Sequence, residues 1–129
     1  MREIKFRAWL KYKKEMVDNA RPDFFSKKLH YLRDNSAGGK DVLGVSTEDI
    51  ELMQYTGLKD KNNKEIYEGD IVKIDRQLFT VSYTEEKASY MLYEIDGFVS
   101  DCLSNYNISK LEIVGNIYKN VVGNFCKNS

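Results

Sequence analysis

Residues 52–74 decide the fold of this chain, and they read Leu-Met-Gln-Tyr-Thr-Gly-Leu-Lys-Asp-Lys-Asn-Asn-Lys-Glu-Ile-Tyr-Glu-Gly-Asp-Ile-Val-Lys-Ile. Two apolar runs flank the charged segment 59–64, which is the pattern of a β-hairpin with a polar loop between its strands. Asn62 and Asn63 lie in that loop, and asparagine tolerates the left-handed backbone that a tight turn needs. The stretch therefore predicts two strands joined by a hairpin loop.

A second turn follows at Glu68-Gly69-Asp70. Gly69 is expected to take a positive φ angle, because glycine has no Cβ atom to oppose it. The Asp70 carboxylate is expected to accept backbone N–H groups across this turn. Gly57, in the first apolar run, predicts a bulge or bend there. The turn at Gly69 then starts a new strand at Ile71.

Downstream of this stretch, short apolar runs alternate with turn signals such as Asp96-Gly97. Strands spaced by eight to twelve residues are typical of a small all-β barrel or sandwich. A strand entered through Gly-Asp, followed by a hairpin and a returning strand, indicates by analogy a small SH3-like barrel. The predicted strands are 71–74, 78–83, 90–93, 98–99 and 111–118.

Upstream, an N-terminal hairpin is predicted. Residues 4–10 alternate between apolar and polar side chains, which favours a half-buried strand. The charged turn 11–14 and a short return strand at 15–17 complete the hairpin. Trp9 falls on the opposite face from Phe6, so it is expected to pack on a second surface or to contact a ligand.

The least regular part is residues 18–47, which we interpret as an irregular connection. Asp23 is placed to cap one or two helical turns over residues 24–29, although this segment equally fits a strand. Residues 35–39 contain two glycines and predict a flexible loop. Residues 101–110 are expected to be looped, with room for one helical turn.

The size and composition favour a single, mainly β domain over residues 1–129. Apolar residues make up 42% of the chain, and nine Tyr and six Phe against one Pro favour strands. The barrel core is placed at roughly 50–118, and residues 121–129 form a tail without a clear pattern. No apolar run is long enough for a membrane span, and the N-terminus does not resemble a signal region, so we expect a cytoplasmic protein.

The sulfur and imidazole groups give no catalytic or metal-binding pattern. Cys102 and Cys126 are far apart and are expected to be free thiols in a reducing cytoplasm, with a disulfide as the alternative. His30 is the only histidine and has no partner at ligand spacing. It is therefore interpreted as a surface or packing residue rather than a catalytic one.

An acidic cluster surrounds the two central turns. It lacks the alternating oxygen spacing of a calcium loop, and nearby lysines balance its charge. We interpret it as a solvated, ion-paired region rather than a metal site, and we expect no metal or cofactor. The acidic residues are Asp60, Glu65, Glu68 and Asp70, and the lysines are Lys59, Lys61 and Lys64.

Charge is unevenly distributed along the chain. Residues 1–40 hold eleven Lys or Arg against five Asp or Glu, a net charge of +6, and the remainder holds nine against fifteen, a net charge of −6. One interpretation is that the N-terminal segment packs along the acidic remainder. The other is a basic face for an anionic partner, since basic and aromatic residues interleave near the N-terminus. The residues of that face are Arg2, Lys5, Phe6, Arg7 and Trp9. The sequence pI of about 6.6 argues against nucleic-acid binding.

Three segments resemble the YopX family, small proteins carried by phages and prophages of low-GC bacteria. The most specific is residues 52–73, with Gln-Tyr-Thr-Gly-Leu-Lys-Asp-Lys followed by Glu-Ile-Tyr-Glu-Gly-Asp-Ile-Val. The other two are residues 4–9 and residues 113–118. Asn63 stands where the family usually has Gly, a mild change because Asn tolerates left-handed φ. After residue 120 the family's usual Pro-Glu-Leu ending is missing.

The resemblance implies a mainly β fold with an SH3-like barrel and brings no established activity or site residues. We therefore expect a prophage-type, non-enzymatic binding or assembly module with an unknown protein partner. A homo-oligomer fits this expectation, because short edge strands offer surfaces for β-sheet addition. The alternatives are a nucleic-acid-binding module that uses the basic N-terminal face and an enzyme whose pocket the sequence does not reveal.

Overall fold

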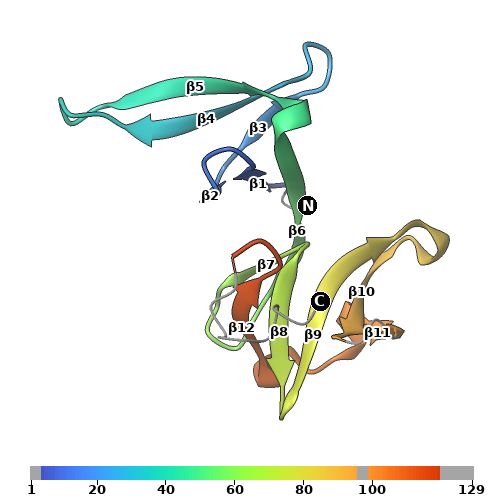
Figure 1. Ribbon diagram of the computed structural model, residues 1–129. Helices are drawn as coiled ribbons and strands as arrows, with labels where there is room; N and C mark the ends of the chain where they lie inside the picture. The colour runs from blue at the N-terminus through green and yellow to red at the C-terminus, as the bar shows by residue number, and fades with distance from the viewer. Residues whose placement is uncertain (1–3, 96–98, 120–129) are drawn as a thin grey trace. The chain divides into compact units, whose positions relative to one another are not determined.

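The computed structural model describes residues 4–95 and 99–119, and the described chain is mainly β, as the sequence predicted (Figure 1). Contacts divide the chain into two compact units, residues Met1–Gln54 (unit 1) and Tyr55–Ser129 (unit 2). The division falls inside β6, Ile50–Lys59. The expectation that the whole chain forms one domain stays a prediction.

Unit 1 begins with the predicted N-terminal hairpin. β1, Phe6–Leu10, pairs with β2, Glu15–Val17, in a register that places Ala8 opposite Val17. The other edge of β1 pairs with the first half of β6, with Ala8 opposite Leu52. Ala8 and Leu10 are buried in these pairings, which confirms the predicted strand, but Arg7 on the opposite face is buried as well, so the prediction of a half-buried strand is wrong.

The prediction of an irregular connection at residues 18–47 is wrong. This segment forms a three-stranded antiparallel sheet in the order β3-β4-β5. The helical alternative at residues 24–29 is also wrong, because the spacing of Phe25, Leu29 and Leu32 does not define a buried face: Leu29 is buried, whereas Phe25 is 99% exposed and Leu32 is 54% exposed. The strands are β3, Arg21–Asp23, β4, Lys28–Asp34, and β5, Lys40–Ser46.

Local turn chemistry was nevertheless detected correctly at Asp23. Its carboxylate accepts hydrogen bonds from the N–H groups of Phe25 (3.0 Å) and Ser26 (3.3 Å). Lys27 then takes a positive φ of 59°, and the chain turns into β4 instead of continuing as a helix. A capping carboxylate satisfies the first N–H groups of a turn and of a helix alike, so it does not select between them.

The core of unit 1 lies between its two sheets. On β4 and β5 the inward residues alternate with outward ones, and Leu29 and Tyr31 are buried while their neighbours face away. The partly buried side chains around this core include Phe6, Leu43, Val45 and Leu52. The buried core residues are Ala8, Leu10, Val17, Ala20, Leu29, Tyr31 and Ile50.

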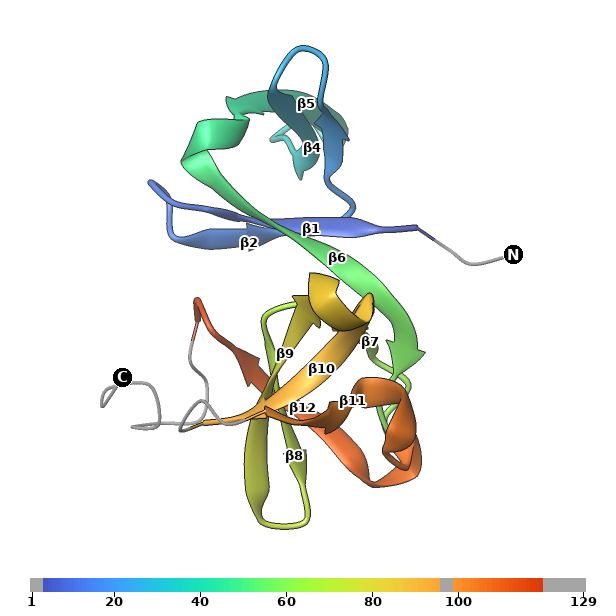
Figure 2. The ribbon, with the colours of Figure 1, turned by 90° about the vertical axis from the view of Figure 1, so that its right-hand side faces the viewer.

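Unit 2 is a meander that confirms the predicted run of short strands. Its five-stranded sheet has the order β11-β10-β9-β8-β12, and it curls into a half-barrel (Figure 2). The strands are β7, Glu65–Tyr67, β8, Asp70–Ile74, β9, Gln77–Thr84, β10, Ser89–Glu94, β11, Val99–Cys102, and β12, Leu111–Asn116. This arrangement fits the predicted small, partly open barrel.

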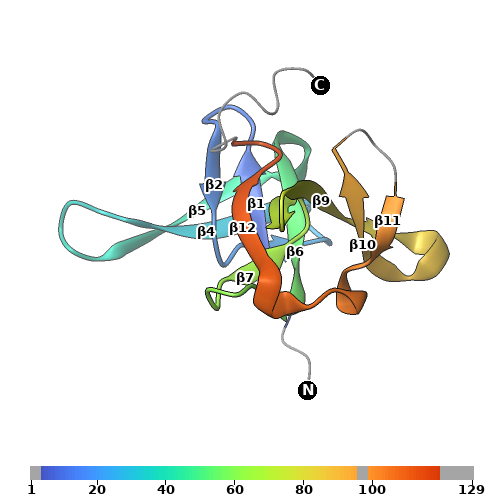
Figure 3. The same ribbon diagram turned by 90° about the horizontal axis from the view of Figure 1, so that it is seen from below.

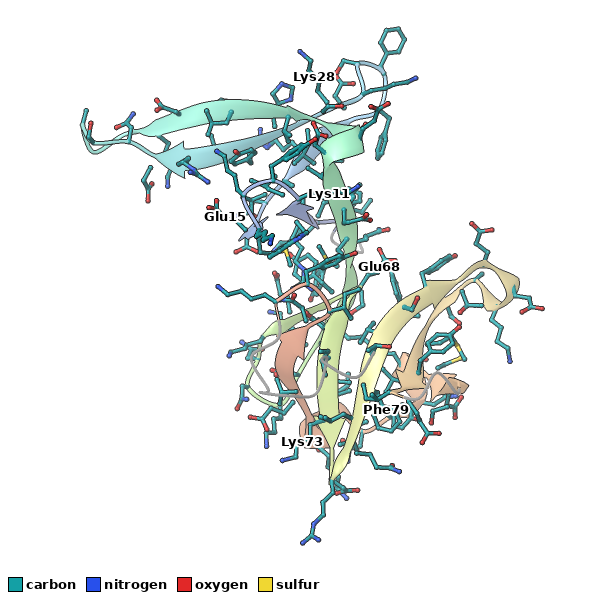
Figure 4. All side chains as sticks on the ribbon, in the orientation of Figure 1. Lys11, Glu15, Lys28, Glu68, Lys73 and Phe79 are labelled. Carbon is teal, nitrogen blue, oxygen red and sulfur yellow. The ribbon has the colours of Figure 1, made fainter. Side chains whose placement is uncertain are left out.

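The concave side of the curled sheet holds the core of unit 2. Phe79 lies among its side chains (Figure 4), and its ring centroid is 6.0 Å from that of Tyr106. Leu103 adds a cover from outside the strands and is 1% exposed. The buried core residues are Ile66, Val72, Phe79, Val81, Leu92, Leu103 and Leu111.

Helical structure in the described residues is limited to single 3-10 turns. Residues 101–110, predicted to be looped with one helical turn, contain two of them. The four turns are η1, Thr47–Asp49, η2, Glu85–Lys87, η3, Leu103–Asn105, and η4, Ile108–Lys110.

Several sequence predictions fall outside the described residues. They concern Arg2 of the basic face, the turn at residues 96–97, Phe98 of the predicted fourth strand, and the tail from residue 121, which includes Cys126.

Candidate functional site

The hairpin loop at residues 59–64 is organised by Asp60, which is only 5% exposed. One carboxylate oxygen accepts hydrogen bonds from the N–H groups of Asn62 and Lys64, both at 2.9 Å. The other oxygen accepts from the N–H of Ile113 on β12, at 3.0 Å. Asn63 takes a φ of 65°, as predicted. Asp60 therefore fixes the loop and also fastens it to β12.

The surroundings of Asp60 change its acidity in two opposing ways. Burial raises the pKa of its carboxyl, whereas hydrogen bonds from the N–H groups of Ile113, Lys64 and Asn62 lower it, and the charge of Lys64 lowers it further. The lowering effects win, so the pKa lies below its ordinary value of 3.8. Asp60 is thus a structural anion, held charged by backbone donors.

The second central turn also uses a buried carboxylate. Asp70 is 1% exposed and accepts a hydrogen bond from the N–H of Tyr67 at 2.8 Å. Gly69 has a φ of 85°, which confirms its predicted conformation. Its N–H donates to the carbonyl of Val81, and its carbonyl accepts from the N–H of Ile117, both at 2.8 Å. This turn joins three segments of unit 2.

The acidic residues of the central stretch differ in their burial and in their hydrogen-bond partners. Asp60 and Asp70 are buried acceptors in their own turns, so the expectation of a solvated acidic region is wrong for these two. Glu65 accepts from the Tyr67 hydroxyl at 3.2 Å. Lys61 forms an ion pair with Glu112 at 3.6 Å, which lies outside the predicted acidic cluster, so pairing between the lysines and that cluster stays a prediction. Across residues 4–95 and 99–119, no group of three or more His, Cys, Asp or Glu is arranged to hold a metal ion.

A shallow, charged hollow of about 390 Å³ lies on unit 2. Its serine hydroxyl, on Ser109, donates to the side-chain oxygen of Asn107 at 2.7 Å. The ion pair between Lys61 and Glu112 occupies another part of the lining. The hollow is lined by Lys61, Lys73, Asp75, Ser109, Lys110 and Glu112.

The predicted basic face on β1 is not displayed as a continuous surface. Arg7 is only 9% exposed, and Lys5 and Trp9 are half-buried. Lys11 forms an ion pair with Glu51 at 3.4 Å and donates from Nζ to the carbonyl of Glu48 at 3.2 Å. Figure 4 places Lys11 beside the start of β6. β1 therefore has buried residues on both of its faces, and its alternating pattern does not mark a basic surface.

Exposed aromatic and basic residues instead meet at two turns of unit 1. Tyr12 is 84% exposed in the β1–β2 turn and is flanked by lysines on both sides. In the β3–β4 turn, Phe24 is 70% and Phe25 is 99% exposed, followed in sequence by Lys27 and Lys28, the latter labelled in Figure 4. Both turns contact η1, because the N–H groups of Lys11 and Thr47 donate to the carbonyls of Asp49 and Lys27.

The histidine and the described cysteine take ordinary packing positions. His30 is half-buried on β4, opposite Gly44 of β5, and its ring lies where a Cβ atom on Gly44 would be 3.5 Å from Cδ2. The ring thus lies over Gly44, and the interpretation of His30 as a surface or packing residue rather than a catalytic one stays a prediction. Cys102 is a free, partly exposed thiol with its sulfur 3.6 Å from the Ser89 hydroxyl.

The outer face of the three-stranded sheet exposes an apolar pair that sequence analysis missed. Leu32 on β4 and Val42 on β5 are direct cross-strand neighbours, and they are 54% and 65% exposed. They line a hollow of about 330 Å³ together with Asn19, Arg21, His30 and Tyr31. The signal was present in the sequence: if Leu29, Tyr31, Leu43 and Val45 face the core of a strand pair, Leu32 and Val42 must face away.

Comparisons with known proteins agree with this description. The family model of the YopX protein matches residues 5–122. The crystal structure of protein EF1440 from Enterococcus faecalis is similar over 92% of this chain and 95% of that one, with 29% sequence identity and a TM-score of 0.66. No curated protein matches the sequence. Within the described ranges, no helix combines the length and hydrophobicity that a membrane crossing requires.

Proposed function

Because this chain belongs to the YopX family, whose description names no activity, we propose a function from the chain's own surfaces. It is a non-enzymatic binding or assembly module that acts through protein–protein contacts. The observation that carries the proposal is the exposed apolar pair Leu32 and Val42 on the outer face of the β3-β4-β5 sheet. The proposal includes the prophage-type origin and the cytoplasmic location that the sequence led us to expect.

The physical basis is the cost of leaving apolar surface in water. Exposed single apolar residues are common on proteins, but neighbouring ones that line a hollow are more often part of a contact surface. Leu32 and Val42 are such neighbours, and Arg21 and His30 add polar groups to the lining of the same hollow. An apolar centre with a polar rim is the usual composition of a protein interface.

The experiment is affinity capture with the full chain as bait, followed by reconstitution of the purified complex. The variant Leu32→Asn should weaken the reconstituted complex by about tenfold or more, because a buried amide would replace an apolar contact. The matched control is Ile117→Asn in unit 2, since Ile117 is exposed to a similar extent, 46%. Equal binding by both variants and the wild type would reject the outer face as the contact surface.

A second candidate function, nucleic-acid binding, is favoured by the exposed aromatic and basic residues of the two turns. Tyr12 stands between Lys11 and Lys13, and Phe25 precedes Lys27 and Lys28. Aromatic rings that stack on bases beside lysines that contact phosphates are the usual elements of a single-strand binding surface.

Fluorescence anisotropy with labelled single-stranded DNA, duplex DNA and RNA, at low and near-physiological salt, tests this candidate. Binding that weakens steeply with salt, and that is lost in Tyr12→Ala and Lys13→Glu, would support it. An absence of binding at low salt would eliminate it.

A further inference from the structure

The β3-β4-β5 sheet has two edges of different character. β3 has only three residues, and its central residue is Pro22, opposite Leu29. Proline has no N–H group, and it occurs in sheets where that missing donor would face solvent. This edge is therefore blocked against a further strand. β5, at the other edge, has seven residues, and none of them is proline.

Hydrogen bonds at both ends of the β4–β5 pair determine which groups of β5 face outward. The N–H of Asn35 donates to the carbonyl of Gly39 at 2.9 Å, and the N–H of Thr47 donates to the carbonyl of Lys27 at 3.1 Å. Hydrogen-bonded pairs alternate with non-hydrogen-bonded pairs in an antiparallel ladder. Odd-numbered residues of β5 thus bond to β4, whereas even-numbered residues present their N–H and C=O groups at the edge. The outward residues are Lys40, Val42, Gly44 and Ser46.

This edge lacks the features by which proteins usually protect an edge strand. Charges occur only at its first two residues, Lys40 and Asp41, and residues 42–45 are uncharged. The register with β4 runs without a bulge over all seven residues. In the part of the chain that the structure describes, no strand pairs with β5 on its outer side. A long, regular edge whose last five residues are uncharged is a template for another strand.

We propose that β5 pairs antiparallel with β5 of a second copy of this chain, with Leu43 opposite Leu43 across a two-fold axis. The proposal rests on the proposed assembly function and names its partner and its contact. The two three-stranded sheets then form one continuous six-stranded sheet. Such an isologous contact uses the same residues of both copies, so it closes as a dimer.

The outward residues of β5 are complementary to those of a second β5 strand, and this favours a second copy as the partner and Leu43 as the centre of the pairing. Edge pairing requires an outward residue opposite an outward residue, so even-numbered residues must meet even-numbered ones. With Leu43 at the centre, Lys40 pairs with Ser46, Val42 pairs with Gly44, and all seven residues take part. A shift toward the hairpin tip that centres the pair on Asp41 would place two carboxylates opposite each other, which is unfavourable.

The side chains of the outer face also fit in this register. Val42 of one copy lies opposite Gly44 of the other, where the missing side chain leaves the backbone exposed beside the His30 ring. Val42 thereby packs against the neighbouring copy, which reduces its exposure from its present 65%. The proposed contact therefore uses Val42 of the apolar pair, whereas Leu32 on β4 lies one strand further from the two-fold axis.

The shape of unit 1 leaves space for this pairing. The β4–β5 hairpin projects from the rest of the unit in two perpendicular views (Figures 1 and 3). Core contacts come from Leu43 and Val45 near its base, whereas residues 40–42 near its tip are exposed. Antiparallel pairing sets the tip of each hairpin beside the base of the other, so the two cores lie at opposite ends of the joined strands.

The test is sedimentation equilibrium of the full chain over a range of concentrations, with the variant Val42→Pro. The N–H of Val42 faces outward, so proline removes an edge donor without removing a hydrogen bond to β4. The wild type is expected to dimerise, and Val42→Pro should raise the dimer dissociation constant by about tenfold or more, because two interchain hydrogen bonds are lost. The matched control, Val42→Thr, keeps the N–H and a β-branched side chain and should dimerise like the wild type.

Val42→Lys is the second variant in case proline disturbs the fold, which circular dichroism will show. It keeps the backbone donor, and adds a charge of the kind that protects natural edges. Dimers in the wild type and Val42→Thr but not in the folded Val42→Lys or Val42→Pro variants support the proposal. A dimer that survives both variants overturns the assignment to β5 but leaves an assembly function standing. A wild type that stays monomeric overturns self-association, and if it also forms no reconstituted complex with a captured protein, the proposed function fails too.

Discussion

The two units of this chain differ in how far their turns and strands are hydrogen-bonded to other parts of the same unit. In unit 2 the turns are fastened to distant strands by buried carboxylates: Asp60 bonds to Ile113 on β12, and Asp70 supports the turn in which Gly69 bonds to Val81. In unit 1 no strand within residues 4–95 and 99–119 pairs with the outer edge of β5, and the apolar pair Leu32 and Val42 is exposed. The comparison shows that unit 2 uses its buried carboxylates for hydrogen bonds within the unit. Unit 1 instead exposes apolar side chains and a strand edge that suit a binding partner.

The variants with the largest expected effect test whether this difference in burial appears in the free energy of unfolding. Leu92→Ala in unit 2 removes a fully buried side chain and should lower the free energy of unfolding by about 3 kcal/mol. Leu32→Ala in unit 1 makes the same chemical change at an exposed site and should cost less than about 1 kcal/mol. Urea unfolding of the two variants measures both values. Equal costs would contradict the assignment of Leu32 to free surface.

Asp60→Ala should destabilise unit 2 by about 2 kcal/mol, because three backbone N–H groups lose their acceptor and one of them belongs to β12. Glu86→Ala, at an exposed position in η2, is the control and should change the free energy of unfolding by less than about 0.5 kcal/mol. Chemical unfolding again provides the measurement. A cost as small as that of the control would mean that the Asp60 loop is not needed to hold β12.

The same carboxylate makes unit 2 sensitive to acid. Because the pKa of folded Asp60 lies below 3.8, the stabilisation is fully present above the unfolded pKa and is lost as the pH falls through the folded value. The unfolding free energy of the wild type should therefore decline below about pH 4 more steeply than that of Asp60→Asn. Unfolding curves collected between neutral and acidic pH measure the two slopes, and parallel slopes would refute the assignment.

A smaller effect concerns the backbone of the hairpin loop. Asn63 has a φ of 65°, so Asn63→Ala should cost about 1 kcal/mol, since alanine lacks a short polar side chain that favours this conformation. Asn63→Gly, the residue that the family usually carries there, should be nearly neutral. Thermal unfolding of both variants compares them directly. A cost for glycine equal to that of alanine would point to a role of the Asn63 side chain instead of its backbone.

The smallest expected effect lies in unit 1. Phe25→Ser should change the free energy of unfolding by less than about 0.5 kcal/mol, because the ring is 99% exposed and contributes little burial. Thermal unfolding measures this effect. A clear loss of stability would show that Phe25 packs in solution and would weaken the contrast between the two units.

Local chemistry explains what could be predicted from the sequence. The turns at Asn63 and Gly69, the bend at Gly57 and the alternating strands of unit 2 follow from backbone preferences and period-two patterns that act over a few residues. Gly57 has a φ of 90°, and the pairing of β6 with β7 shifts there. The resemblance to the YopX family added the expectation of an SH3-like barrel to the mainly β class.

Residues 18–47 show where local sequence patterns no longer predict the secondary structure. Asp23 caps its turn as expected, but the choice between helix and strand depended on pairing with β5, which lies more than ten residues away. Long-range pairing overrides weak local preferences, so this choice could not be read from the segment itself.

The sequence by itself determined the turn positions, most strands of unit 2 and the mainly β class, since each of these depends on neighbouring residues. Only the tertiary structure decided the burial of Arg7, Asp60 and Asp70 and the exposure of Leu32 and Val42. Burial depends on which segments pack together from distant parts of the chain, and a charged or apolar residue has the same sequence signature whether it is covered or open to solvent.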